Sequence, residues 1–352
     1  MIGYYVHHHG VGHLTRARSV ARALAEPVTV LSSRPRPSDI DPFAGWITLP
    51  LDTPDGSADP ALDTPDGSAD PAPDTPAGGD DPDDPTAHGV VHWAPISVPG
   101  MTDRMTALAR FVDELRPRCV VVDVSVEVAM FVRLMGVRVV VFAMPGERTD
   151  APHQLAYRVA DRIVAPWSAS VYRPEWLREF EDRTVYAGSI SAHADRARAG
   201  TDRDPTSVVV LAGAGGSALT PDHLARAGAA TPTRTWRGVG APGTPWVDDV
   251  WPLLTGAGVV VTHGGQNAVA DVAASGAPAV IVAESRPHGE QLATTRALGA
   301  AGLAISLESW PDPDRWPEIL NRAGALTGDI RARTEVDGAA RRAAAAIEDV
   351  WA

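Results

Sequence analysis

Short apolar runs alternate with helix-like patterns along most of the chain. Runs such as CVVV, VVVF and VVVT are apolar at every position, which is typical of parallel strands covered on both faces. The predicted strands lie near residues 2–8, 28–32, 119–123, 137–143, 184–188, 207–212, 258–262 and 278–283. This alternation predicts an α/β protein with two doubly wound, Rossmann-like parallel sheets.

The first predicted helix has one apolar face. Residues at helical spacing form this face, and they are Leu14, Ala17, Val20, Ala21 and Leu24. We expect the arginines at positions 16, 18 and 22 to point away from the core.

The chain length and one polar stretch predict two domains. At 352 residues the chain exceeds one ordinary core, and SAHADRARAGTDRDPTS at 191–207 precedes a new strand, glycine turn and helix. The predicted parts are a first domain over 1–191, a linker over 192–206, a second domain over 207–334 and a final helix over 335–352. The pattern does not indicate where the final helix docks.

The acidic net charge comes mostly from one segment. The formal charge is −13, yet residues 51–87 carry eleven Asp and no Arg, so the rest of the chain is at −2. This segment repeats LDTPDGSADPA at 51–61 and 62–72 and consists mainly of Pro, Gly, Ser and Asp, without the apolar side chains needed to bury a core. We expect a mobile, solvated insert, because such a composition cannot offset the entropy of ordering.

The basic residues exclude several functions. All 31 are Arg, so a P-loop lysine or a Schiff-base lysine is impossible, and they are too scattered for a nucleic-acid surface.

No apolar run approaches the roughly 18 residues of a membrane span, and the chain opens on a strand-like run rather than a leader. We expect a cytoplasmic protein; membrane association is not expected, but the sequence does not exclude it. The single Cys119 reads as a buried core residue, and the oligomeric state is not indicated.

Two predicted strands run into glycine turns followed by helices. The first turn contains Gly10 and Gly12, and the second contains Gly213, Gly215, Gly216 and Ser217. Glycine lets the backbone approach a ligand closely, and the helix start offers N–H groups to an anion.

An NADP-dependent oxidoreductase is one interpretation of the first turn. It has two of the three fingerprint glycines but Thr15 in place of the third. Ser33 and Arg34 after the next strand would suit a 2′-phosphate. The bulky His13 opposes this interpretation, because it lies where the pyrophosphate would approach.

A third glycine cluster follows the strand that ends near residue 262. Its polar residues at the predicted helix start are His263, Gly264, Gly265, Gln266 and Asn267. They lie at the carboxyl end of a parallel sheet, where ligands of such folds bind, and they would suit a diphosphate. Downstream, Glu290 and Gln291 offer a carboxylate and an amide to sugar hydroxyls.

Three segments together resemble the GT-B glycosyltransferases. They are GVGHLTRARSVARAL, RPRCVVVD and WVDDVWPLLTGAGVVVTHGGQNAVADVAASGAPAVIVAESRPHGEQ. The chain is similar to families that hold nucleotide-sugar-dependent natural-product transferases and the N-acetylglucosaminyltransferase of peptidoglycan precursor synthesis. The resemblance implies two Rossmann-like domains facing across a cleft, with the acceptor in the first and the donor in the second.

The resemblance also implies roles for individual residues. His13 matches the general base, Asp123 matches the carboxylate that orients it, and Gly10 and Gly12 belong to the acceptor-side loop. A His–carboxylate pair suits this role, because imidazole can take up a proton near neutral pH and its cation needs a counter-charge.

The second domain carries the donor residues implied by the resemblance. Gly264, Gly265, Gln266 and Asn267 match the diphosphate-binding helix start, with His263 as a donor to phosphate. The facing loop of this domain, also on the donor side, is matched by Gly213, Gly215, Gly216 and Ser217. Trp246 and Val247 match the residues that hold the nucleobase. Glu290 and Gln291 match the pair that binds the donor sugar. Asp271 stands where relatives usually have the Glu that binds ribose, which leaves the preference for UDP open.

The histidine run at residues 7–9 also needs an interpretation. Consecutive strand residues alternate between faces and chelate poorly, so we expect no metal site here and choose His13 as the working histidine. His9 would line the cleft.

These observations predict an inverting, metal-independent and cofactor-independent glycosyltransferase. It would move a sugar from a nucleotide-sugar, with UDP the expected nucleotide, to a hydroxyl or amine of a small-molecule acceptor. The acidic insert favours a cationic acceptor over a phosphate-bearing one, or has no role. A nucleotide-sugar hydrolase or epimerase remains an alternative, and a non-catalytic sugar-nucleotide-binding protein is a more remote one.

Overall fold

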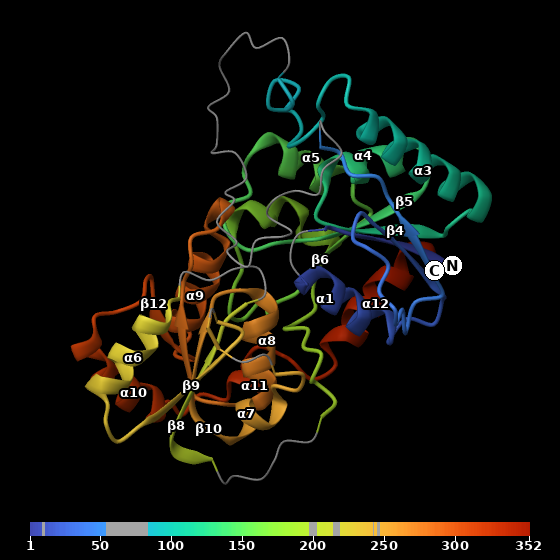
Figure 1. The fold of residues 1–352 in the computed structure, drawn as a ribbon. Coiled ribbons are helices and arrows are strands. Elements are labelled where there is room, and N and C mark those ends of the chain that lie inside the picture. The colour runs from blue at the N-terminus through green and yellow to red at the C-terminus, as the bar shows by residue number, and fades with distance from the viewer. Residues whose placement is uncertain (9–10, 54–83, 197–202, 214–218, 242, 245–246) are drawn as a thin grey trace.

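Two parallel sheets form the framework of the protein, as the computed structural model shows (Figure 1). The structure describes residues 1–8, 11–53, 84–196, 203–213, 219–241, 243–244 and 247–352. Most of the acidic repeat, which we predicted to be mobile, lies outside these residues.

The first sheet has seven strands in the order β3-β2-β1-β4-β5-β6-β7. Their bounds are β1 Ile2–Val6, β2 Val28–Ser32, β3 Gly45–Thr48, β4 Cys119–Asp123, β5 Arg138–Phe142, β6 Arg162–Ala165 and β7 Thr184–Tyr186. All described pairings are parallel, and β1 pairs with both β2 and β4. Cys119 is fully buried, as predicted.

The second sheet has five strands in the order β12-β11-β10-β8-β9, again with parallel pairings. Their bounds are β8 Asp204–Leu211, β9 Thr235–Val239, β10 Ala257–His263, β11 Ala279–Val282 and β12 Ile305–Leu307. The first strand, β8, begins inside the range 192–206 that we predicted as linker.

Helices cover the faces of both sheets. The chain up to the end of β7 is called the first part of the protein, and the chain after β7 is called the second part. The helices of the first part are α1 Gly12–Ala21, α3 Pro99–Leu115, α4 Val126–Leu134, α5 Ala151–Val159 and the 3₁₀ segment Glu175–Arg183. Those of the second part are α6 Pro221–Ala230, α7 Trp251–Gly256, α8 Gln266–Ser275, α9 Glu290–Ala300, α10 Trp316–Gly324, α11 Ile330–Arg333 and α12 Ala339–Glu348, with short 3₁₀ turns at Pro287–Gly289, Pro313–Arg315 and Asp349–Trp351. No helix in the described ranges is both long and apolar enough to cross a membrane.

Four strands were not predicted from the sequence. They are β3, β6, β9 and β12, with the sequences GWIT, RIVA, TWRGV and ISL. Each is short and contains glycine or a polar residue, so neighbouring strands in the sheet, rather than a long apolar run, determine its conformation.

The final helix α12 returns to the first sheet and packs beside α1 (Figure 1). Ala343 and Ile347 are fully buried in the same cluster as Ile2 and Tyr4 of β1. The predicted apolar face of α1 packs into this cluster as well. The end of the chain therefore completes the core of the first sheet, which the helical pattern alone did not reveal.

Truncating this contact should destabilise the protein. Ile347→Ala removes a fully buried side chain, and we expect the free energy of unfolding to fall by about 2 to 5 kcal/mol. Urea unfolding followed by circular dichroism measures this loss. Arg341→Ala on the exposed side of the same helix serves as the control, and an equal loss in both variants would contradict the packing role.

Candidate functional site

The starts of α1 and α8 meet between the two sheets. The side-chain nitrogen Nδ2 of Asn267 donates to the backbone oxygen of Gly12 at 2.8 Å. Arg16 Nη1 donates to Gln266 Oε1 at 2.7 Å. Neither helix has a side-chain cap, so both present N–H groups with partial positive charge to the same region. This junction brings together the first and third glycine turns.

His13 lies against Asp123 at this junction. Its Nδ1 atom is 2.9 Å from Asp123 Oδ1, and the two side chains are 18% and 0% exposed. The His13 ring is therefore accessible to a ligand, whereas the Asp123 carboxylate behind it is fully buried. When Nδ1–H donates to Asp123, the nearby Arg16 nitrogen contacts the ring without a hydrogen bond to it, and Nε2 is left as an acceptor, which is the arrangement that a general base needs.

Arg16 is buried in this site, so our expectation that it points away from the core is wrong. Its Nε and Nη2 atoms contact the two oxygens of Asp123 at 3.0 and 2.5 Å, and Nη2 is 3.1 Å from His13 Nδ1. Its guanidinium also lies 5.1 Å from the centre of the Phe142 ring. A bidentate partner and an aromatic neighbour stabilise a charge that the apolar pattern of α1 did not account for.

The carboxylate of Asp123 stays ionised because of these partners. Burial alone would raise its pKa, but the charges and hydrogen bonds of Arg16 and His13 lower it to about 2. The site therefore holds an ionised carboxylate, paired with the Arg16 cation, behind the His13 ring.

His263 occupies the space between two glycine turns. Its Nδ1 atom accepts a hydrogen bond from the backbone N–H of Gly265 at 3.0 Å. Burial lowers the pKa of His263 and so favours the neutral ring. Because Nδ1 accepts a hydrogen bond, the proton of the neutral ring is on Nε2. A β-carbon added to Gly213 would come within 2.6 Å of Nε2, and one on Gly265 within 2.4 Å of Cε1. Only glycines allow this ring to lie there, with an N–H donor directed toward Gly213.

Gly264 packs directly on α9. A β-carbon at this position would meet the backbone oxygen of Gln291 at 2.5 Å. The Gln291 side chain is buried, and its Oε1 accepts from the backbone N–H groups of Gly264 and Glu284 at 3.0 and 3.1 Å. A sugar hydroxyl could meet only the amide nitrogen of this residue.

Glu290 and Asp271 each have a protein partner. Glu290 accepts from Nη2 of the buried Arg148 at 3.4 Å. Asp271 Oδ1 accepts from the hydroxyl of Ser191 at 2.6 Å, and burial raises the pKa of Asp271 above its ordinary value. Arg148 escaped the sequence analysis because nothing near it repeats or forms a motif.

Several predicted residues lie outside the described part of the chain. They are His9, Gly10, Gly215, Gly216, Ser217 and Trp246. Val247 is described, and it is partly buried against the core of the second sheet.

Arg34, which the NADP interpretation requires, donates from Nη1 to the backbone oxygen of His8 at 2.7 Å.

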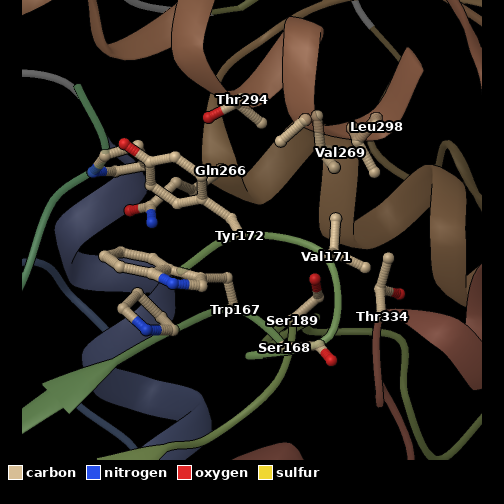
Figure 2. A pocket seen from close by; sticks show the side chains of 13 residues that line it. Trp167, Ser168, Val171, Tyr172, Ser189, Gln266, Val269, Thr294, Leu298 and Thr334 are labelled. Atoms are coloured by element: carbon tan, nitrogen blue, oxygen red, sulfur yellow. The ribbon is translucent and has the colours of Figure 1, made fainter. Parts of the chain in front are cut away.

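A small cavity adjoins Gln266 (Figure 2). Side chains from both parts of the protein line it, including Trp167 and Tyr172 from the loop after β6 and Val269 from α8. Its volume of about 40 Å³ suits a single water molecule rather than a nucleotide-sugar. Gln266 Nε2 is buried without a hydrogen-bond partner among the described residues, so a water here would satisfy it.

The two parallel α/β sheets have the architecture of a GT-B fold, and solved structures match it over nearly the whole chain. MurG from Acinetobacter baumannii is 15% identical, with 99% of each chain covered and a TM-score of 0.61. The spinosyn forosaminyltransferase SpnP is 12% identical, with 99% of this chain and 98% of that chain covered and a TM-score of 0.63. A UDP-glucosyltransferase from Polygonum tinctorium is 12% identical, with the same coverage and a TM-score of 0.59. No protein-family model and no curated protein sequence matches the chain.

The buried charges of the site make the protein sensitive to acid. The pKa of Asp123 is lowered to about 2 in the folded state, against roughly 3.9 when unfolded, so its stabilising contribution is present above pH 4 and is lost between about pH 4 and 2. In Asp123→Asn that part of the pH dependence should disappear. At pH 7 this variant should lose about 3 to 5 kcal/mol, because Arg16 is left buried without its carboxylate.

Urea unfolding at a series of pH values measures both effects. Asp113→Asn removes an exposed ion pair with Arg116 and should change the free energy of unfolding by less than about 1 kcal/mol. A loss in Asp123→Asn no larger than in this control would contradict the buried network.

Proposed function

We propose that the protein is an inverting glycosyltransferase that moves a sugar from a nucleotide-sugar to a hydroxyl or amine of a small-molecule acceptor. The observation that carries this proposal is the contact between the partly exposed His13 and the fully buried Asp123. This pair lies where the start of α1 meets the start of α8, and His263 lies shortly before that start in the chain. In this proposal His13 is the base and the start of α8 is the anion-binding region, and the two lie on helices whose starts are in contact. The GT-B fold of the matched structures supports the same conclusion.

The first step is deprotonation of the acceptor. Nε2 of His13 takes the proton of the acceptor hydroxyl or amine as that group attacks the anomeric carbon of the donor sugar. The bond from this carbon to the diphosphate breaks, and the bonding electrons leave with the diphosphate. Asp123 stabilises the imidazolium that forms, and Arg16 holds the carboxylate in place.

The second domain stabilises the leaving diphosphate. The Nε2–H of His263 and the uncapped N–H groups at the start of α8 are the donors that we assign to it. The turn around Gly213 faces them, Asp271 would meet the ribose, and Glu290 with the amide nitrogen of Gln291 would meet the sugar. In this scheme the transfer requires no metal ion or cofactor at the reacting atoms.

UDP is the nucleotide that we propose for the donor. The matched Polygonum tinctorium protein is a UDP-glucosyltransferase capable of glucosylating indoxyl, and its structure contains 3,4-dichloroaniline. That amine agrees with an acceptor of small size carrying a hydroxyl or amine.

Nucleotide binding and base catalysis should separate in two variants. His263→Ala should lose metal-independent binding of the nucleoside diphosphate, because it removes a donor from the diphosphate site, whereas His13→Ala should keep it. Calorimetric titration with UDP, TDP, GDP and NADP measures this difference, and His88→Ala, at a 91% exposed side chain, is the control. Binding of NADP alone, or of no nucleotide, would contradict the donor site.

Turnover tests the role of His13. With an acceptor panel of amines and alcohols, His13→Ala should lower kcat by about 10²- to 10⁴-fold while the nucleotide Kd stays unchanged. Chromatography of UDP and of the glycoside measures the reaction. Release of free sugar without glycoside in the wild-type protein would show hydrolysis instead of transfer.

A further inference from the structure

A second group of histidines lies beside the proposed donor site. His92, Asp150, His153 and His288 each offer one ligand atom, and these atoms all lie within 4.8 Å of one another. His92, Asp150 and His153 belong to the first part of the chain, whereas His288 belongs to the loop that precedes α9 in the second part. No motif in the sequence connected them, because they are spread over almost 200 residues.

Backbone contacts hold this group in place. The N–H of Glu147 donates to the backbone oxygen of His288 at 2.8 Å. Gly146 allows the approach, since a β-carbon there would come within 2.3 Å of the same oxygen. Asp150 is the N-cap of α5 and accepts from the N–H of His153 at 3.0 Å. On the other side, the N–H of His92 donates to Glu127 Oε1 at 2.8 Å.

Three of the side chains are spaced as ligands of one metal ion. His92 Nε2 lies 3.4 Å from Asp150 Oδ1, and His288 Nδ1 lies 3.8 Å from Asp150 Oδ2. A tetrahedral zinc ion with bonds of about 2.0 to 2.2 Å places neighbouring ligand atoms about 3.3 to 3.6 Å apart. The rings of His92 and His288 have centres 6.0 Å apart and their candidate ligand atoms lie within 4.8 Å of each other, so rotation of these side chains would bring both nitrogens to one ion.

His153 supports Asp150 rather than joining the ligands. Nη1 of Arg148 lies 3.2 Å from His153 Nε2, and a guanidinium can only donate, so this nitrogen is the acceptor. The proton of His153 is therefore on Nδ1, which lies 2.6 Å from Asp150 Oδ2. Hydrogen bonds of this kind orient the carboxylate ligands of metal sites. Glu290 accepts from Arg148 and offsets its positive charge next to the group.

We propose that His92, Asp150 and His288 bind one divalent transition-metal ion of the zinc type, with His153 as a positioning residue. Imidazole nitrogens with one carboxylate oxygen suit such ions better than magnesium or calcium. The ion joins the loop before α9 to the start of α5 and so ties the two parts of the protein together. It takes no part in the sugar transfer proposed above, and the site does not depend on that function.

Cobalt provides the test of this site. The full-length protein, stripped of metal with a chelator, is titrated with Co²⁺ and followed by visible absorption, and Zn²⁺ then displaces the cobalt. One equivalent with the intense bands of a four-coordinate site is expected, the fourth ligand being water. Asp150→Asn, which keeps the helix cap, and His288→Asn, which tolerates the positive φ of 57° at this position, should each weaken binding at least tenfold. His153→Ala should weaken it about 10- to 100-fold.

Two controls make the result decisive. His223→Ala removes a histidine outside the group and should leave Co²⁺ binding unchanged. Zn²⁺ should raise the melting temperature of the wild-type protein, but not that of His288→Asn, whose folding is checked by circular dichroism. The proposal is overturned if no equivalent of Co²⁺ binds, or if binding survives in Asp150→Asn and His288→Asn; loss of binding in the double variant His7→Ala/His8→Ala would then assign the metal to the histidine run.

Discussion

The buried pair of Arg16 and Asp123 is the interaction on which the arrangement of the site depends. Asp123 ends β4, Arg16 lies on α1, and one guanidinium nitrogen reaches Gln266 of the second part. A buried pair of this kind adds little net stability but is costly to break, because either charge alone would be desolvated. It therefore keeps the start of α1, the carboxylate behind His13 and the start of α8 in one geometry.

Close backbone approach is the second constraint on the site. Gly213 and Gly265 leave room for the ring of His263, while Gly264 leaves room for α9 and the side chain of Gln291. Each of these glycines is needed because a β-carbon would overlap a neighbouring group, so packing shapes the turns. A rigid turn with a fixed histidine tautomer is suited to binding an anion without rearrangement.

The two parts of the protein are connected at more than one edge. Arg16 and Asn267 connect the helix starts, α12 returns to the first sheet, and Arg148 reaches Glu290 near the group of His92, Asp150, His153 and His288. Glu290 follows His288 by two residues, so anything that positions this loop also positions the carboxylate assigned to the donor sugar. The metal proposal and the transfer proposal thus concern neighbouring but separate side chains.

The sequence by itself determined the α/β class, the parallel strands with long apolar runs, the apolar face of α1 and the pairing of His13 with Asp123. Apolar runs and glycine turns are local patterns, and the resemblance of GVGHLTRARSVARAL and RPRCVVVD carried the pair. Only the tertiary structure decided the buried position of Arg16, the docking of α12, the short strands β3, β6, β9 and β12, and the meeting of His92 with His288. These depend on contacts between residues far apart in the chain, because a buried charge or a short strand is stabilised only by the partners that folding places beside it.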